Sequence, residues 1–181
     1  HSCESCPIGL VCQGDDSYEK VEPLSEWTTD GGVYKLQSCP FGYYKISNEN
    51  ALDQQRCEFC EKGTECTVPP CDENCLSCEP GKYKDIKGTH ACRNCISGKY
   101  NMKSESTSEA DCLQCPPNAD TKGDAQTSNT CECKEAFYES SKGDECFVCP
   151  TGAKCSNDFC ALRNPDKICP DTSNTIVGTW M

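Results

Sequence analysis

Basic and apolar residues are both scarce in this chain of 181 residues. It has 17 Lys and Arg residues against 29 Asp and Glu residues, which gives a formal net charge of −12. A protein that binds phosphate backbones needs a basic patch, so the acidic balance disfavours nucleic acid and anionic lipid as partners. Only 35% of the residues are apolar, and no stretch repeats them at a helical period. The sequence therefore does not predict a large hydrophobic core.

Long apolar runs and histidines are also lacking. The longest weakly apolar run, residues 175–181, is too short to span a bilayer, and no segment of this sequence has the pattern of a signal peptide. The chain opens with His1 instead of Met, so we expect a processed or excised portion with any membrane anchor outside it. The other histidine, His90, is interpreted as a solvated turn residue. Carboxylates are abundant but lie along loops, with no rigid element to bring them together. We therefore expect no enzymatic activity and no cofactor.

Cysteine is the abundant residue, with 21 copies. That is more than one residue in ten, while disulfide-rich secreted scaffolds begin at roughly 8–10%. So many disulfides persist only outside the reducing cytosol, which predicts an extracellular protein, secreted or part of a cell-surface ectodomain. Covalent links must supply the order that the small core cannot.

Two short patterns recur along the chain. The first, C-x-x-C-x-x-G-x-x-C, occurs three times and begins at Cys3, Cys57 and Cys146. The second has a cysteine followed by Gly at +3 and Tyr at +5, and it begins at Cys39, Cys78 and Cys95. Glycine at +3 suits a tight turn with a positive φ, and the tyrosine suits the start of a short strand beside a disulfide. Each unit therefore predicts a small hairpin tied at its base.

Two further copies depart from the second pattern. Cys133 keeps Tyr138 but has Ala136 in place of the glycine, and Cys115 has Asn118 there. Asparagine also tolerates a positive φ. The predicted fold class is small, disulfide-rich and mostly β or irregular: an elongated tandem array of short two-stranded cysteine-rich modules.

Spacing alone does not fix the disulfide connectivity. A rule that joins each repeat-opening cysteine to the next one is self-consistent, and it gives the pairs Cys39–Cys57, Cys78–Cys92, Cys95–Cys112, Cys115–Cys131 and Cys133–Cys146.

The C-x-x-G-x-Y…C-x-x-C units resemble ephrin-receptor-like cysteine-rich repeats, which are relatives in pattern of the tumour-necrosis-factor-receptor modules. The wider arrangement, with Gly-Val-Tyr-Lys-Leu before Cys-Pro-Phe-Gly-Tyr-Tyr, is similar to very large repeat-built surface proteins of unicellular eukaryotes. The receptor-module resemblance implies crossed bridges. These are Cys60–Cys71 with Cys66–Cys75, and Cys149–Cys160 with Cys155–Cys169. Cys6–Cys12 then remain to pair locally, and Cys3 is expected to pair outside the chain.

The module boundaries follow from the same repeats. Residues 1–38 read as the end of a preceding module plus a connector that contains Trp27, and 39–77 as a cysteine-rich module. Residues 78–132 read as three ephrin-receptor-like repeats and 133–169 as another cysteine-rich module. Residues 170–181, with Trp180, resemble the start of the Trp27 connector. We therefore expect this chain to be about one period of a longer array.

Metal and redox chemistry are the alternatives to a purely structural use of cysteine. Some C-x-x-C intervals approach zinc-site spacing, but zinc needs reduced thiolates and leaves many single cysteines unexplained. A thioredoxin-like site needs a C-x-x-C at a helix start within a βαβ unit, and no such pattern is present. Asp15 and Asp16 are candidates for calcium binding, but no D-x-D-x-D-G loop follows them, so a solvated acidic turn is favoured.

The sequence thus favours display and binding over catalysis. The first hypothesis is an extracellular structural or interaction segment, in an adhesin, a surface layer or a filament. The alternative is a soluble ligand-binding ectodomain of a receptor. The expected partners are other surface or extracellular proteins, copies of this chain included, with no nucleic acid and no membrane insertion within this segment. Trp27 and Trp180 are the candidate contact residues, because Trp is enriched at binding hot spots; the competing interpretation is a packing plug between modules.

Overall fold

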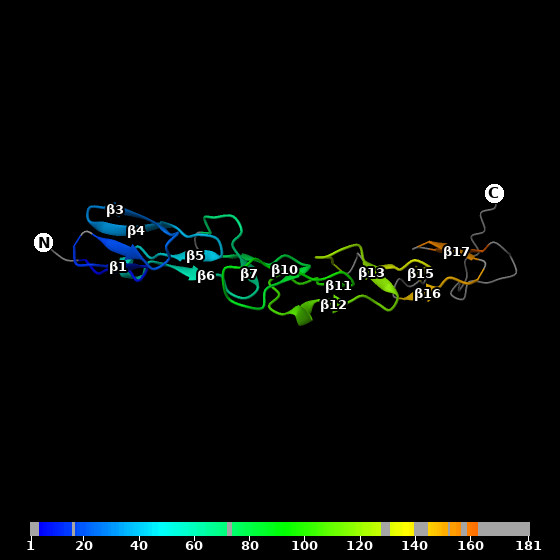
Figure 1. The fold of residues 1–181 in the computed structure, drawn as a ribbon. Helices are drawn as coiled ribbons and strands as arrows, with labels where there is room; N and C mark the ends of the chain where they lie inside the picture. Colours follow the sequence, from blue (N-terminus) through cyan, green and yellow to red (C-terminus); the bar gives the residue numbers. More distant parts are fainter. Residues whose placement is uncertain are drawn as a thin grey trace. The chain divides into compact units, whose positions relative to one another are not determined.

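Short hairpins make up almost all of the regular structure. The structure is a computed structural model that describes residues 4–15, 17–71, 74–127, 131–139, 145–151, 153–156 and 159–162. Two-stranded sheets follow one another along this part of the chain (Figure 1). The pairs are β1 (Leu10–Cys12) with β2 (Tyr18–Lys20), β3 (Glu26–Asp30) with β4 (Val33–Ser38), β5 (Tyr43–Ile46) with β6 (Arg56–Phe59), β7 (Thr64–Glu65) with β8 (Leu76–Ser77), β9 (Lys82–Tyr83) with β10 (Arg93–Asn94), β11 (Lys99–Tyr100) with β12 (Leu113–Gln114), β13 (Ala119–Thr121) with β14 (Cys131–Cys133), β15 (Phe137–Glu139) with β16 (Cys146–Val148), and β17 (Ala153–Ser156) with β18 (Phe159–Leu162).

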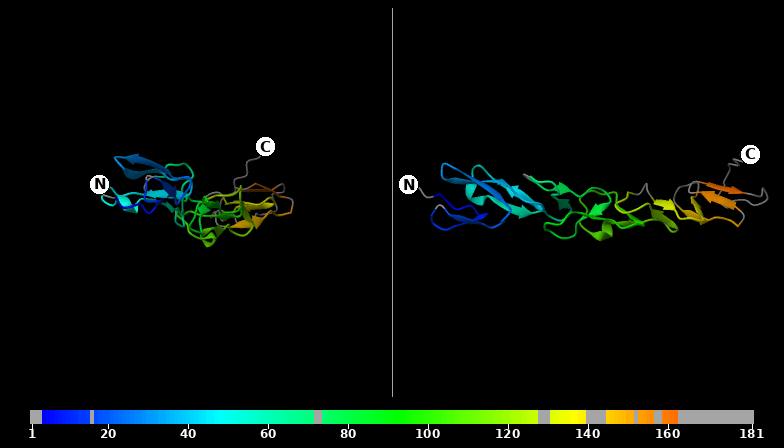
Figure 2. Two further views of the ribbon diagram at one scale, coloured as in Figure 1. Left: turned by 60° about the vertical axis from the view of Figure 1, so that its left-hand side comes forward. Right: turned by 45° about the horizontal axis from the view of Figure 1, so that its top comes forward.

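Helical structure is limited to two 3₁₀ turns in the described part of the chain, η1 (Leu52–Gln54) and η2 (Glu109–Asp111). No helix among the described residues has the length and apolar character needed to cross a bilayer. The chain divides into two compact units, His1–Arg93 with Lys103–Asp111, and Asn94–Met102 with Cys112–Met181. Figure 2 shows the strands of each unit as separate pairs of arrows instead of one continuous sheet. This arrangement confirms the predicted class of tandem disulfide-rich modules.

The turn after each repeat-opening cysteine has a left-handed residue, as the second pattern predicted. Gly42, Gly81 and Gly98 have φ values of 76°, 86° and 83°. Asn118 and Ala136 occupy the same position with φ values of 64° and 70°. The backbone therefore keeps the same turn geometry at all five positions, although a left-handed conformation is unfavourable for an alanine such as Ala136.

Disulfides close the hairpins. The structure has the bridges Cys6–Cys12, Cys39–Cys57, Cys78–Cys92, Cys95–Cys112, Cys115–Cys131 and Cys133–Cys146, which coincide with expected pairs. Most of the deeply buried apolar residues are cysteines, such as Cys60 and Cys78, both 0% exposed. The bridges thus occupy the interior that an aliphatic core would fill in a larger domain.

The crossed pairing at the second ten-residue motif is wrong. Cys60 bonds to Cys75 and Cys66 bonds to Cys71, instead of Cys60–Cys71 and Cys66–Cys75. The four cysteines pack in one cluster, so distance along the chain does not decide between the pairings. Gly42 N donates to Cys66 O at 3.0 Å, Lys45 N donates to Cys71 O at 3.3 Å, and Cys60 N donates to Gly42 O at 2.9 Å. Residues 42–45 therefore hold Cys60, Cys66 and Cys71 together.

The crossed pairing at the third motif is also wrong. Cys149 bonds to Cys155, which excludes both of the predicted bridges, Cys149–Cys160 and Cys155–Cys169. In this motif Ala153 N donates to Pro150 O at 2.9 Å. The first motif has the same Cys-Pro start and the equivalent bond from Leu10 N to Pro7 O, at 2.9 Å. The two motifs therefore share the Cys-Pro start, the turn and the local bridge, whereas the second motif has the equivalent bond from Thr64 N to Glu61 O but no Cys-Pro start and no local bridge. The backbone of Cys160 lies in β18, while Cys3 and Cys169 lie outside the described residues.

Backbone hydrogen bonds join neighbouring hairpins. The loop of each repeat reaches back to the cysteine that opens the preceding hairpin. Gly88 N donates to Cys60 O at 3.1 Å, Glu105 N to Cys78 O at 2.8 Å and Ala125 N to Cys95 O at 2.9 Å. All three donors have a positive φ. The modules within each unit are therefore interlocked through main-chain groups.

Some of the repeat tyrosines, and the residue after one of them, also contribute to the interior. Tyr83 and Tyr138 are buried, while Tyr44 and Tyr100 are half-buried. The residue directly after Tyr83, Lys84, is 0% exposed, and its Nζ donates to Thr64 O and Gly88 O, both at 2.8 Å. Burial lowers the pKa of Lys84, and the negative charges of Glu65 and Glu61 act against that shift.

Candidate functional site

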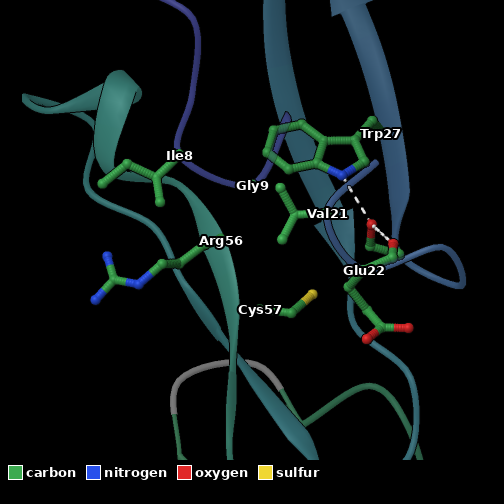
Figure 3. Close-up of a pocket in the computed structure, with 8 residues that line it drawn as sticks. Ile8, Gly9, Val21, Glu22, Trp27, Arg56 and Cys57 are labelled. Carbon is green, nitrogen blue, oxygen red and sulfur yellow. Dashed lines mark hydrogen bonds between the residues drawn. The ribbon is translucent and has the colours of Figure 1, made fainter. Parts of the chain in front are cut away.

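The candidate site is a hollow beside Trp27 in the first unit, called here the Trp27 hollow. It is lined by Ile8, Gly9, Val21, Glu22, Ser25, Trp27, Arg56 and Cys57 and has a volume of about 70 Å³ (Figure 3). Its walls come from the loop closed by Cys6–Cys12, from the segment before β3, and from the start of β6.

The loop that carries Ile8 and Gly9 is fixed by its backbone. Ile8 N donates to Asp53 O at 2.8 Å, and Gly9 N donates to Gln55 O at 2.9 Å. Val21 N in turn donates to Gly9 O at 3.0 Å. The loop thus lies between the β1–β2 hairpin and the η1 turn, which gives the hollow a defined wall.

Trp27 packs across this loop through the edge of its ring. A Cβ atom on Gly9 would lie 2.6 Å from Cζ2 of Trp27, so the glycine makes room for the indole. The indole Nε1 donates to Ser25 Oγ at 2.9 Å, and Ser25 Oγ donates to Glu22 O at 2.6 Å (Figure 3). Trp27 is half-buried. Its polar atom is satisfied internally, and one part of its ring remains beside the hollow.

Gln55 supports the site from beneath, and sequence reasoning missed it. It is 3% exposed, accepts from Leu36 N at 2.9 Å, and donates to Tyr34 O at 3.0 Å and Leu52 O at 2.9 Å. Its own carbonyl binds Gly9. One buried amide therefore ties β4, η1 and the Gly9 loop together. A lone glutamine in a polar segment offers no pattern that would have predicted this role.

The exposed groups of the hollow are apolar with charges at the edge. Ile8 is 49% exposed and Val21 is 62% exposed. Arg56 and Glu22 lie on opposite sides of the hollow (Figure 3). Arg56 Nε lies 3.3 Å from Glu58 Oε2, so its charge is offset by a neighbour.

Two pKa shifts mark the surroundings of the hollow. Burial, with a hydrogen bond and charge interaction from Glu22, raises the pKa of Tyr43 to about 12. Glu58 also pairs with Lys87 Nζ at 3.0 Å, and this hydrogen bond is the main cause that lowers the pKa of Glu58. The Glu58 carboxylate on this side of the unit is thus held in its charged form, and Tyr43 is held in its neutral form.

The other sequence candidates lie elsewhere. Asp15 accepts bonds from the Ser17 backbone, at 2.8 Å, and from the Ser17 hydroxyl, which lower the pKa of Asp15. This is an exposed acidic turn, and Asp16 lies outside the described residues. His90 is half-buried with Nε2 enclosed by protein, so the expectation of a solvated side chain is wrong. Trp180 lies outside the described residues.

The arrangement suits binding of a side chain. The described residues contain no cluster of three or more His, Cys, Asp or Glu side chains placed to hold a metal ion. The exposed part of the hollow is mostly aliphatic and aromatic carbon, with the charged groups of Glu22 and Arg56 at its edge. Such a surface removes apolar area from water when a partner covers it.

Tandem disulfide-tied hairpins of this kind define an extracellular modular protein. Within the chain, residues 66–112 match the family described as "Tyrosine-protein kinase ephrin type A/B receptor-like". This confirms the resemblance to ephrin-receptor-like repeats for the segment that holds the bridges Cys78–Cys92 and Cys95–Cys112. The likenesses to tumour-necrosis-factor-receptor modules and to surface proteins of unicellular eukaryotes stay predictions.

The mouse (Mus musculus) protein "Sushi, von Willebrand factor type A, EGF and pentraxin domain-containing protein 1" is 24% identical to this chain over 138 residues. The match covers 72% of this chain and 4% of the mouse protein. The chain thus spans a small fraction of the length of this modular relative. Cysteine-rich modules of these types are typically non-enzymatic and interact with other proteins.

Proposed function

We propose that this chain is a structural and interaction segment of an extracellular modular protein, which displays contact surfaces in a fixed order and performs no catalysis. The observation that carries the proposal is the interlock between consecutive hairpins, in which Gly88, Glu105 and Ala125 each bind the cysteine carbonyl that opens the preceding hairpin. A repeat that binds only its neighbours forms a quasi-one-dimensional array, as solenoid proteins do.

Such an array suits adhesion, a surface layer or an extracellular filament. Its surface, and not an enclosed cavity, is the part that partners reach. The module boundaries expected at residues 38, 77, 132 and 169 form part of this proposal. The acidic balance, with a net charge of −12, favours partners with basic surfaces and supports solubility of the exposed array.

A second candidate is the ligand-binding ectodomain of a receptor. It is favoured by the description of the family that residues 66–112 match. Full-length gene architecture separates the two: many further copies of this unit support the structural role, and a few copies with one transmembrane helix support a receptor.

Small-angle scattering of the oxidised chain tests the array. A compact protein of this length has a radius of gyration of about 16 Å by the usual scaling, and we expect a clearly larger value. A compact radius would refute the array. The location is tested on intact cells that express the full-length protein, by labelling them with a membrane-impermeant biotin reagent. A protein that is found in the cytosol and carries no biotin would refute extracellular display.

A further inference from the structure

We propose that the Trp27 hollow docks one aliphatic side chain, about the size of leucine, from a partner protein whose surface around that side chain is basic. The inference deepens the proposed function and rests on it. A volume of about 70 Å³ is far below the roughly 300–1,000 Å³ of small-molecule pockets, so the hollow has room for one side chain and not for a larger ligand.

The apolar contact surface extends beyond the hollow itself. In the β1–β2 pair Leu10 lies opposite Lys20 and Val11 lies opposite Glu19. Since side chains alternate along a strand, Gly9, Val11, Glu19 and Val21 share one face, and Gly9 is the residue on which the Trp27 ring rests. Val11 is 51% exposed. Ile8, Val11 and Val21 therefore form an exposed apolar border around Trp27.

The ring of Trp27 is positioned before any partner binds. Its Nε1 is bonded to Ser25, which is 2% exposed, and the loop beneath the ring is held by Gln55. A pre-organised aromatic residue loses little rotamer freedom on binding, which is one reason why tryptophan is common among hot spots.

Charge identifies the kind of partner. Glu22 lines the hollow, and Glu19 shares the face of Val21. The one basic residue of the lining, Arg56, is paired with Glu58. Lysine or arginine beside the docked side chain would find complementary charge here, whereas a second copy of this chain, with a net charge of −12, would be repelled.

Three synthetic pentapeptides with blocked ends serve as probes: Lys-Lys-Leu-Lys-Lys, Lys-Lys-Gly-Lys-Lys and Glu-Glu-Leu-Glu-Glu. Each is titrated to millimolar concentration into the oxidised, ¹⁵N-labelled chain. The Trp27 indole resonance is assigned with the variant Trp180→Phe. We expect the Lys-Leu peptide to shift the Trp27 indole and the Gly9 and Val21 amides, with smaller shifts at high salt. The Lys-Gly and Glu-Leu peptides should shift them at least several-fold less.

Val21→Ser and Val68→Ser are the matched variants. Both valines are exposed, at 62% and 78%, but Val68 does not line the hollow. Val21→Ser should weaken binding of the Lys-Leu peptide by about threefold or more, because it removes apolar contact, and Val68→Ser should leave it unchanged. Retention of the wild-type amide spectrum shows that each variant is folded.

Several results would overturn the proposal. They are equal shifts with the Lys-Gly peptide, stronger binding of the Glu-Leu peptide, absence of any shift at Trp27, and equal effects of the two variants. Dimerisation in sedimentation equilibrium that Val21→Ser abolishes would assign the hollow to a second copy and overturn the basic partner. The peptide and variant results leave the cell-surface labelling and the radius of gyration of the single chain unchanged, and scattering at a concentration below dimerisation measures that radius, so failure here is distinguishable from failure of the proposed function.

Discussion

Replacing Gly42 with alanine tests the packing between hairpins most directly. Gly42 has a φ of 76°, and a Cβ atom there would lie 2.2 Å from Thr89 Cα and 2.4 Å from Thr89 O. These are backbone atoms in the loop between β9 and β10, so they cannot move aside by a rotamer change. The substitution therefore adds a backbone clash to the cost of a left-handed alanine.

Gly14→Ala is the matched control, because Gly14 has a similar φ of 87° and a Cβ atom added to it would meet no heavy atom within 4 Å. A left-handed conformation costs a non-glycine residue about 1–2 kcal/mol, and forced overpacking costs about 1–3 kcal/mol more. We expect Gly14→Ala to lower the free energy of unfolding by about 1–2 kcal/mol and Gly42→Ala by about 2–5 kcal/mol.

Guanidinium unfolding with the disulfides intact, followed by near-UV circular dichroism, measures both values. The m-value should stay constant between the variants, so that the midpoints report stability. Equal destabilisation by the two substitutions would show that the Thr89 loop does not rest on Gly42, and the reasoning on interlocked hairpins would fail at this contact.

Three further predictions concern single side chains. Ala136→Gly should raise the free energy of unfolding by about 1 kcal/mol in the same assay, because glycine relieves the φ of 70° at this position; a loss of stability would contradict this. Lys84→Met should lower it by about 1–3 kcal/mol, because the buried carbonyls of Thr64 and Gly88 lose their donor; a neutral effect would show that these carbonyls find other donors. The pKa of Tyr43 is raised from 10.0 to about 12, so the unfolded chain loses this proton first and the contribution of Tyr43 to stability falls as the pH rises from 10 to 12. Tyrosinate absorbance of the folded chain should show one late step that is absent in Tyr43→Phe, and an unchanged late step would refute the assignment.

The repeat pattern predicted the local geometry well, because one local constraint determines it. The turn after each opening cysteine needs a left-handed residue, and the glycines at 42, 81 and 98 indicated this directly. The bridge Cys39–Cys57 followed from the rule that joins each repeat-opening cysteine to the next one.

Pairing within the clusters was not predictable in the same way. At Cys60, Cys66, Cys71 and Cys75 several pairings satisfy the spacing, and all four cysteines pack in one cluster, so neither spacing nor proximity selects one pairing. At Cys149 a clue was present but unused, since the Cys-Pro start is shared with the Cys6 motif. A comparison between the two motifs would have predicted the local bridge.

The residues that shape the Trp27 hollow were harder to predict from the sequence. Trp27 was identified as a contact candidate from its residue type alone. The burial of Gln55 and the exposure of Ile8 and Val21 depend on how three segments meet, and their local sequence carries no periodic signal.

The hydrogen bonds from Gly88, Glu105 and Ala125 to cysteine carbonyls have an evolutionary consequence. They join main chain to main chain, so they are indifferent to most of the side chains in the loops that supply them. Mutations in those loops can change the displayed surface without loosening the array, provided that the donor keeps its left-handed backbone. A lineage that duplicates such hairpins can therefore diversify its contact surfaces faster than its architecture, while recombination that cuts within a hairpin removes a donor from one module and an acceptor from the next.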